Sequence, residues 1–176
     1  MIYLKPVLAP HQVWSARFRD HAVMLHFAYG SNMHRGVMRR HAPAASSLGV
    51  ARLADHRFVI TADGYASIAP ARGELVYGVL WRLAPRDRVT LDLWENIAGG
   101  LYRATTLPVQ CAAGRRAALV YVARPRPDGE PKSGYMEVVV KAAREWGLPS
   151  DYIHSLQRWL PRRQRAAGHR KLEHFE

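Results

Sequence analysis

Glu95 is the first candidate for proton-transfer chemistry in this chain of 176 residues. It lies near the C-terminal end of a predicted helix, where the helix dipole disfavours a negative charge. The neighbouring Trp94 and Ile97 indicate a partly apolar environment, and Asp92, on the same helical face, adds like-charge repulsion. These effects raise the pKa of the Glu95 carboxyl from about 4.3 toward the range of a general base at neutral pH. The alternative is a surface acid that balances the many Arg residues.

A second candidate is the turn Tyr29-Gly30-Ser31-Asn32, which follows a predicted buried strand and precedes a predicted helix. Gly30 can adopt backbone angles that other residues resist, and Ser31 or Asn32 can cap the helix. A tight turn into a helix N-terminus directs several free N–H groups at one point, which suits a carboxylate or an oxyanion. An ordinary capped turn is the alternative.

Tyr121 and Tyr135 are further polar side chains expected in apolar surroundings. Tyr121 lies in a predicted strand and Tyr135 in the first turn of a predicted buried helix, where a hydroxyl usually has a hydrogen-bond partner. A structural role is the more common case for such tyrosines. The sequence has no nucleotide-binding glycine motif, no nucleophile elbow and no metal-ligand spacing among its nine His residues, so we expect no metal and no cofactor. We interpret the single cysteine, Cys111, as structural.

The elements that must position these residues follow from the hydrophobic pattern. Strands are predicted over 22–28, 56–61, 65–68, 74–83, 102–109 and 116–123, and helices over 33–41, 85–95, 133–146 and 150–160. Gly78 indicates a bulge or a close backbone approach, and Ser133 is the predicted N-cap of the third helix. Val89 and Leu93 share one face of the second helix. Strands followed by helices without regular alternation are typical of the α+β class.

Composition excludes several classes of protein. No apolar run approaches the roughly 20 residues of a membrane-spanning helix, so we expect no membrane partner. The first 23 residues lack the apolar stretch of about 7–15 residues that a secretory signal needs, which favours a cytoplasmic protein. We expect residues 1–21 to form an N-terminal extension, 22–160 one domain, and 161–176 a basic tail.

The net charge of +12 makes nucleic acid a possible partner. Six Lys and Arg residues and no acidic residue lie between Arg158 and Lys171. A solvated basic tail explains this run, and a nucleic-acid-binding module that uses it is the less favoured alternative. Deleting residues 161–176 separates the two hypotheses, because a binding module would lose salt-sensitive affinity while an enzyme would keep its turnover.

Five motifs in order, spanning roughly residues 25–160, resemble the γ-glutamylcyclotransferase family, also described as γ-glutamylcyclotransferase-like or AIG2-like. They are Phe27-Ala-Tyr-Gly-Ser-Asn-Met33, Val50-Ala-Arg-Leu-Ala-Asp55, Gly73-Glu-Leu-Val-Tyr-Gly-Val-Leu80, Leu91-Asp-Leu-Trp-Glu95 followed by Tyr102, and Ser133-Gly-Tyr135 through Gly147-Leu-Pro149 to Tyr152.

The resemblance implies a fold, a reaction and site residues. The fold would be a small mixed β-barrel flanked by helices. The enzyme would act on a small γ-glutamyl molecule, releasing an amino acid or amine as the glutamyl part closes to 5-oxoproline. By this match Glu95 is the acid/base, the loop Tyr29, Gly30, Ser31 and Asn32 holds the glutamyl group, and Tyr121 and Tyr135 line the pocket.

One residue departs from the family pattern. Asn96 stands where the family usually has Gly after the catalytic Glu, in a loop on the side of the leaving group. The leaving group, amino acid or alkylamine, therefore stays open, although the closing motif favours amino-acid substrates. The sequence does not give the oligomeric state.

Overall fold

A computed structural model describes residues 24–125 and 127–161. The predicted N-terminal extension (1–21) and all but the first residue of the predicted basic tail (161–176) lie outside these described residues. Within the described ranges, no helix combines the length and the apolar character needed to cross a membrane.

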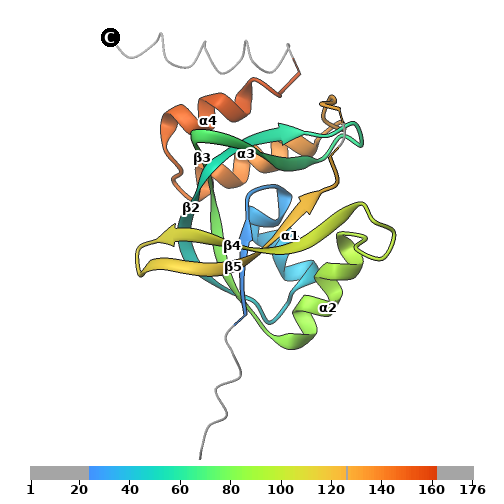
Figure 1. The fold of residues 1–176 in the computed structure, drawn as a ribbon, viewed down its shortest axis with the longest axis vertical. Helices are drawn as coiled ribbons and strands as arrows, with labels where there is room; N and C mark the ends of the chain where they lie inside the picture. The colour runs from blue at the N-terminus through green and yellow to red at the C-terminus, as the bar shows by residue number, and fades with distance from the viewer. Residues whose placement is uncertain (1–23, 126, 162–176) are drawn as a thin grey trace, which may run out of the picture.

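Five strands close into a barrel in the order β1-β3-β2-β4-β5 (Figure 1). The strands are β1 (Met24–Ala28), β2 (Ser46–Ile60), β3 (Ala66–Leu83), β4 (Tyr102–Cys111) and β5 (Gly114–Ala123). β1 and β5 pair in parallel, while the other neighbours pair antiparallel, so the barrel is mixed. The predicted fold class, α+β with a small mixed barrel flanked by helices, is confirmed.

β2 and β3 are longer than the sequence pattern indicated. The strand predicted over 56–61 begins at Ser46, and the strands predicted over 65–68 and 74–83 are one continuous strand. Pro70 and Gly73 interrupt the apolar pattern, but they lie in an exposed part of the β2–β3 hairpin. An irregularity of register at Ala54/His56 and the positive φ of Gly73 (81°) accommodate these two residues without ending the pairing.

Helices cover the barrel in two groups, with α3 and α4 together at one end and α1 and α2 together near the other (Figure 1). Their bounds, with the 3-10 helix η1, are η1 (Ser31–Met33), α1 (Arg35–His41), α2 (Pro85–Trp94), α3 (Tyr135–Glu145) and α4 (Ser150–Gln157).

The start of α3 differs from the prediction. Ser133 is not its N-cap, because Gly134 occupies that position with φ at 79° and no side chain caps the helix. A left-handed turn at this glycine brings the chain into the helix, and only glycine adopts that conformation without steric cost.

One continuous core joins the strands to α3. Its buried side chains include Phe27 and Val79 from the strands and Met136 and Val139 from the helix. The burial expected of α3 is therefore observed. On α2, by contrast, the side chains that share one face are exposed to solvent: Val89 is 62% exposed and Leu93 is 74% exposed.

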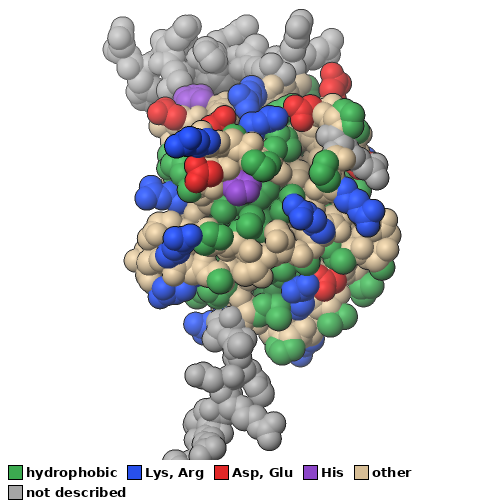
Figure 2. Space-filling view, in the orientation of Figure 1, with side chains coloured by type: hydrophobic (Ala, Val, Ile, Leu, Met, Phe, Trp, Pro, Cys, Tyr) green, Lys and Arg blue, Asp and Glu red, His purple; other side chains and the backbone are tan. Residues whose placement is uncertain are grey.

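Lys and Arg side chains are spread over the face of the molecule seen in Figure 2, with acidic side chains among them. No basic patch stands out on this face. The Arg-rich run that motivated the nucleic-acid alternative lies mostly outside the described residues.

We expect Gly78→Ala to destabilise the barrel. A Cβ at Gly78 would lie 2.2 Å from the backbone oxygen of Ala28 and 2.9 Å from the Phe27 ring, which confirms the predicted close backbone approach. Overpacking of this kind costs about 1–3 kcal/mol, measurable by urea unfolding. Gly36→Ala is the matched control, since its Cβ would meet only the side chain of His34. Equal losses in the two variants would contradict the proposed constraint.

Candidate functional site

The loop after β1 enters the site through a short 3-10 turn. Its backbone bonds run from the N–H of Met33 to Gly30 O (3.0 Å) and from the N–H of His34 to Ser31 O (2.9 Å). Neither Ser31 nor Asn32 caps the following helix, contrary to the prediction. His34 takes that position instead, and its Nδ1 accepts from the N–H of Gly36 at 3.2 Å.

Gly30 is needed for close approach and not for an unusual φ. Its φ is −107°, outside the left-handed region that favours glycine, so the space around the residue is the constraint that the structure shows directly. A Cβ at this position would lie 2.8 Å from the Tyr135 hydroxyl oxygen and 3.3 Å from the Ala66 Cβ. The absence of a side chain lets α3 bring Tyr135 against the loop.

Glu95 follows the last residue of α2, and its N–H donates to Leu91 O at 2.8 Å. Its Oε1 accepts a hydrogen bond from Asn32 Nδ2 at 2.7 Å. This bond joins two predicted site elements that lie 63 residues apart in sequence. The side chain of Asn32 is itself buried (6% exposed), which fixes the direction of the amide donor.

The pKa of the Glu95 carboxyl is raised from 4.5 to about 7. Burial is the largest cause, because a desolvated carboxylate is costly. The hydrogen bond from Asn32 lowers the pKa, and the negative charge of Asp92 raises it. The raised pKa and two of its causes, the apolar surroundings and the charge of Asp92, agree with the expectation from the sequence.

Three of the surrounding tyrosines donate their hydroxyl protons to protein acceptors. Tyr29 donates to the backbone oxygen of Tyr121, Tyr121 to Asp92 Oδ1 (2.7 Å), and Tyr102 to the backbone oxygen of Ala66 (2.7 Å). Burial raises the pKa of all three hydroxyls, so they stay protonated at neutral pH. These bonds fix the ring positions in the wall of the site.

Tyr135 is arranged differently. Its hydroxyl oxygen accepts from the N–H of Ala66 at 3.2 Å, and burial raises its pKa to about 12. Ser31 also hydrogen-bonds this hydroxyl and lowers its pKa. The oxygen is therefore held as an acceptor, which leaves the O–H proton for a group within the site.

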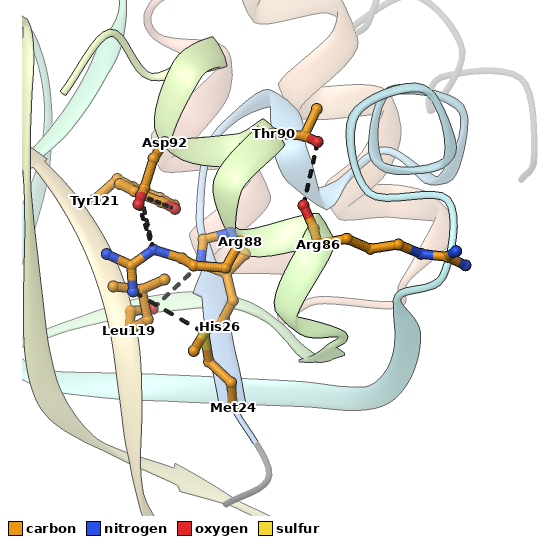
Figure 3. A network of polar contacts seen from close by, with 8 residues as sticks. All are labelled: Met24, His26, Arg86, Arg88, Thr90, Asp92, Leu119 and Tyr121. Atoms are coloured by element: carbon orange, nitrogen blue, oxygen red, sulfur yellow. Dashed lines mark hydrogen bonds and ion pairs between the residues drawn. The ribbon is translucent and has the colours of Figure 1, made fainter. Parts of the chain in front are cut away.

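Further polar contacts surround Tyr121 and its partner Asp92 (Figure 3). Arg88 Nε donates to both carboxylate oxygens of Asp92, at 2.7 and 2.8 Å, and this carboxylate accepts the Tyr121 proton. The His26 ring packs edge-on against Tyr121, and its Nδ1 lies 3.2 Å from Leu119 O. Burial lowers the pKa of His26 to about 4, so its imidazole is neutral. Arg88 is then the cation that balances Asp92.

A cavity of about 370 Å³ brings all the predicted site residues together. Tyr29, Gly30, Ser31, Asn32, Glu95, Tyr121 and Tyr135 all line it. Other lining side chains were not predicted as site residues: Val37, Arg40, His41, Tyr65, Trp94, Leu101, Tyr102 and Val138. Trp94 adjoins Glu95 and Tyr102 belongs to a quoted motif, so both could have been found. Among the described residues, no group of three or more His, Cys, Asp or Glu side chains could hold a metal ion.

Asn96 explains how the chain tolerates its departure from the family pattern. Its φ is 49°, in the left-handed region, where glycine is favoured and asparagine is among the better tolerated substitutes. Its Oδ1 also accepts from the N–H of Gly99 at 3.0 Å, which stabilises the turn after Glu95. Asparagine is therefore accommodated at this left-handed position.

Comparisons with known proteins agree with this geometry. The sequence model described as the AIG2-like family matches residues 75–156. The human γ-glutamylcyclotransferase is 27% identical over 149 residues, covering 78% of this chain and 79% of the relative, and the bovine one is 28% identical over 151 residues, covering 80% of each. A solved structure named γ-glutamyl cyclotransferase superposes with a TM-score of 0.73 at 26% identity, covering 78% of this chain and 88% of that one. The chain is therefore similar to γ-glutamylcyclotransferases in sequence and in fold.

The family model matches some of the residues that line the cavity and not others. The AIG2-like match contains Glu95, Tyr121 and Tyr135 but begins after the loop at Tyr29–Asn32. The loop reaches the matched segment through the Asn32–Glu95 hydrogen bond and the contact of Gly30 with Tyr135.

We expect Glu95→Gln to stabilise the fold more at pH 8 than at pH 5. The folded-state pKa of about 7 exceeds the ordinary value of 4.5, so between these values the folded protein holds a proton that the unfolded chain has lost. The stability that this carboxyl contributes is present below the unfolded pKa and is lost as pH rises through 7. At pH 5 the protonated acid resembles Gln closely.

The measurement is the difference in Tm between variant and parent at the two pH values. Glu74→Gln, on the exposed part of β3, is the control and should give the same small difference at both. A Glu95→Gln difference that does not grow with pH would show that the carboxyl has an ordinary pKa.

Proposed function

We propose that this protein is a γ-glutamyl cyclotransferase, an enzyme that closes a γ-glutamyl group to 5-oxoproline and releases an amine or amino acid. The proposal rests mainly on the Glu95 carboxyl. This group lines the cavity, accepts a hydrogen bond from Asn32 and has a pKa of about 7. The names of the relatives support the same reaction.

The reaction begins with proton removal. The substrate's α-ammonium group transfers a proton to the Glu95 carboxylate, and the resulting amine attacks the γ-carbonyl carbon of the same molecule. Because nucleophile and electrophile are tethered, correct folding of the substrate supplies an effective molarity on the order of 10⁵ M or more. The protein must therefore hold the glutamyl group in a bent conformation.

The same carboxyl completes the reaction. Ring closure forms a C–N bond and places a negative charge on the former carbonyl oxygen. Glu95 then returns its proton to the leaving nitrogen, the original C–N bond breaks, and the carbonyl re-forms. The attacking nitrogen, which still carries an extra proton after ring closure, loses it to the released amine or to water, which gives neutral 5-oxoproline N–H. A group with a pKa near the working pH is suited to both transfers, since neither protonation state is strongly favoured.

The loop at Tyr29–Asn32 would hold the substrate's α-carboxylate. The turn's own hydrogen bonds use the N–H groups of Met33 and His34. We assign carboxylate binding to the N–H groups of the Gly30–Asn32 turn other than that of Ser31, whose backbone already hydrogen-bonds the Tyr135 hydroxyl. Tyr135 offers its O–H proton beside this loop, while Tyr29 and Tyr121 shape the wall.

We propose residues 22–160 as the catalytic domain, with the segments 1–21 and 161–176 outside the chemistry. Deletion of residues 161–176 should leave turnover unchanged. Loss of a salt-sensitive nucleic-acid affinity as the main effect would favour the nucleic-acid alternative, and loss of turnover would contradict the placement of the tail outside the chemistry.

We expect Glu95→Gln to lower kcat at least about 10²-fold, as removal of a general acid/base does. Gln keeps the shape but cannot accept the ammonium proton, so substrate binding should persist. The assay is 5-oxoproline release from a panel of γ-glutamyl amino acids and amines. Near-parental turnover of a folded Glu95→Gln protein, with Glu74→Gln as the control, would contradict the mechanism.

We expect Gly30→Ala to lower kcat/KM far more than Ser31→Ala. The new Cβ would displace the Tyr135 hydroxyl or the loop itself, and a misplacement of about 1 Å can cost roughly 10²-fold in rate. Ser31→Ala removes one side-chain hydrogen bond, which costs about 1 kcal/mol. Tm values measured in parallel decide the interpretation, since activity that only follows stability in both variants would rule out the backbone cradle.

A further inference from the structure

The cavity has a closed end and an open end, and the open end contains side chains that the proposed chemistry does not use. At the closed end Tyr121, Tyr29 and Asn32 are 3%, 5% and 6% exposed. At the open end Trp94 is 51% exposed, and Arg40 is exposed as well. Glu95 lines the same cavity and adjoins Trp94 in sequence.

This division orients the substrate. If the loop at Tyr29–Asn32 holds the glutamyl carboxylate and Glu95 lies at the bond that breaks, the departing amine must extend toward Trp94. The leaving group therefore meets the open end, whose side chains decide which amines fit.

Trp94 is held at this end by an aromatic contact between two helices. Its indole stacks on the His41 imidazole of α1, with ring centroids 3.8 Å apart and planes 22° from parallel. Burial, and then the charge of Arg40, lower the pKa of His41, which keeps the ring neutral. The stack covers part of the indole, and half of the Trp94 side chain stays open to solvent.

Arg40 adds a positive charge beside this aromatic pair. It lines the cavity, and no ion pair to it is found within residues 24–125 and 127–161. A guanidinium in this position can form two parallel hydrogen bonds to a carboxylate. An anion on the departing amine could satisfy it without displacing another acid.

We propose that Arg40, His41 and Trp94 form a leaving-group subsite, which selects γ-glutamyl compounds whose departing amine carries both an aromatic side chain and a carboxylate. The aromatic ring packs on the open part of the Trp94 indole, and Arg40 binds the carboxylate. This inference rests on the proposed function and goes beyond it, since the reaction alone requires neither group on the amine.

The test is a set of four substrates that separates ring from charge: γ-glutamylphenylalanine, γ-glutamylphenethylamide, γ-glutamylalanine and γ-glutamylethylamide. For the parent protein we expect kcat/KM to rise about threefold to tenfold for the ring, the scale of an aromatic contact of 0.5–1.5 kcal/mol. We expect a similar gain for the carboxylate.

Two variants assign each preference to its residue. Trp94→Ala should reduce the ratio between ring-bearing and ringless substrates to about one while the carboxylate ratio persists, and Arg40→Gln should do the reverse. Leu93→Ala and Arg39→Gln are the matched controls, because both residues are exposed neighbours that do not line the cavity. Neither control should change a ratio.

Calorimetric titration of the same four compounds into Glu95→Gln separates this inference from the reaction. If no compound gives 5-oxoproline, the proposed function fails, and the binding constants then test the subsite alone. Equal rates and affinities for all four compounds would overturn the subsite, as would preferences that Trp94→Ala and Arg40→Gln leave unchanged. A preference lost equally in Leu93→Ala would place the ring on the outer face of α2 and also overturn the proposal.

Discussion

The site depends on one hydrogen bond, from the Asn32 amide to the Glu95 carboxyl. It joins the loop that leaves β1 to the end of α2, and it is the contact through which a desolvated acid keeps a polar partner. Burial alone would push the pKa of Glu95 further from its ordinary value, because a carboxylate loses its hydration there. The amide opposes that shift by donating to the charged form. The resulting pKa near 7 is therefore a balance of burial against one donor, and the position of that donor is set by the barrel.

The barrel holds this balance because most of the polar groups around Glu95 already have partners within the protein. Tyr29 and Tyr102 donate into the barrel wall, and Tyr121 donates to Asp92. A hydroxyl that already donates a hydrogen bond to the protein cannot rotate toward the cavity without losing that buried bond, which costs about 1–3 kcal/mol. The walls are consequently rigid, and the groups left to respond to a ligand include the Glu95 carboxyl, the Tyr135 hydroxyl and the buried Asn32 Oδ1. This division is what a site for repeated proton transfer needs.

Local sequence predicted the parts of the site that depend on near neighbours. The helix end at Glu95 and its apolar flanks are separated by only a few residues, so helical periodicity and the dipole were sufficient. The Asn32–Glu95 contact spans 63 residues and follows from barrel closure, which no local pattern encodes. The close approach at Gly30 was not predicted, since its contact with Tyr135 depends on how α3 packs against the loop. The length of β3 was missed because exposed pairing tolerated Pro70 and Gly73, which the pattern treats as strand ends.

The Arg88–Asp92 ion pair limits the effect of the Asp92 charge on the pKa of Glu95. Asp92 is needed to accept the Tyr121 proton, yet an unpaired carboxylate beside Glu95 would raise the pKa of Glu95 strongly. Arg88 binds both oxygens of Asp92 and also lies 5.9 Å from the centre of the Tyr121 ring, so one cation offsets the charge and contacts the ring that depends on it. The remaining repulsion from Asp92 is the smallest of the three causes acting on Glu95. Burial therefore sets the working pKa, and the anion required for positioning Tyr121 adds only a minor correction.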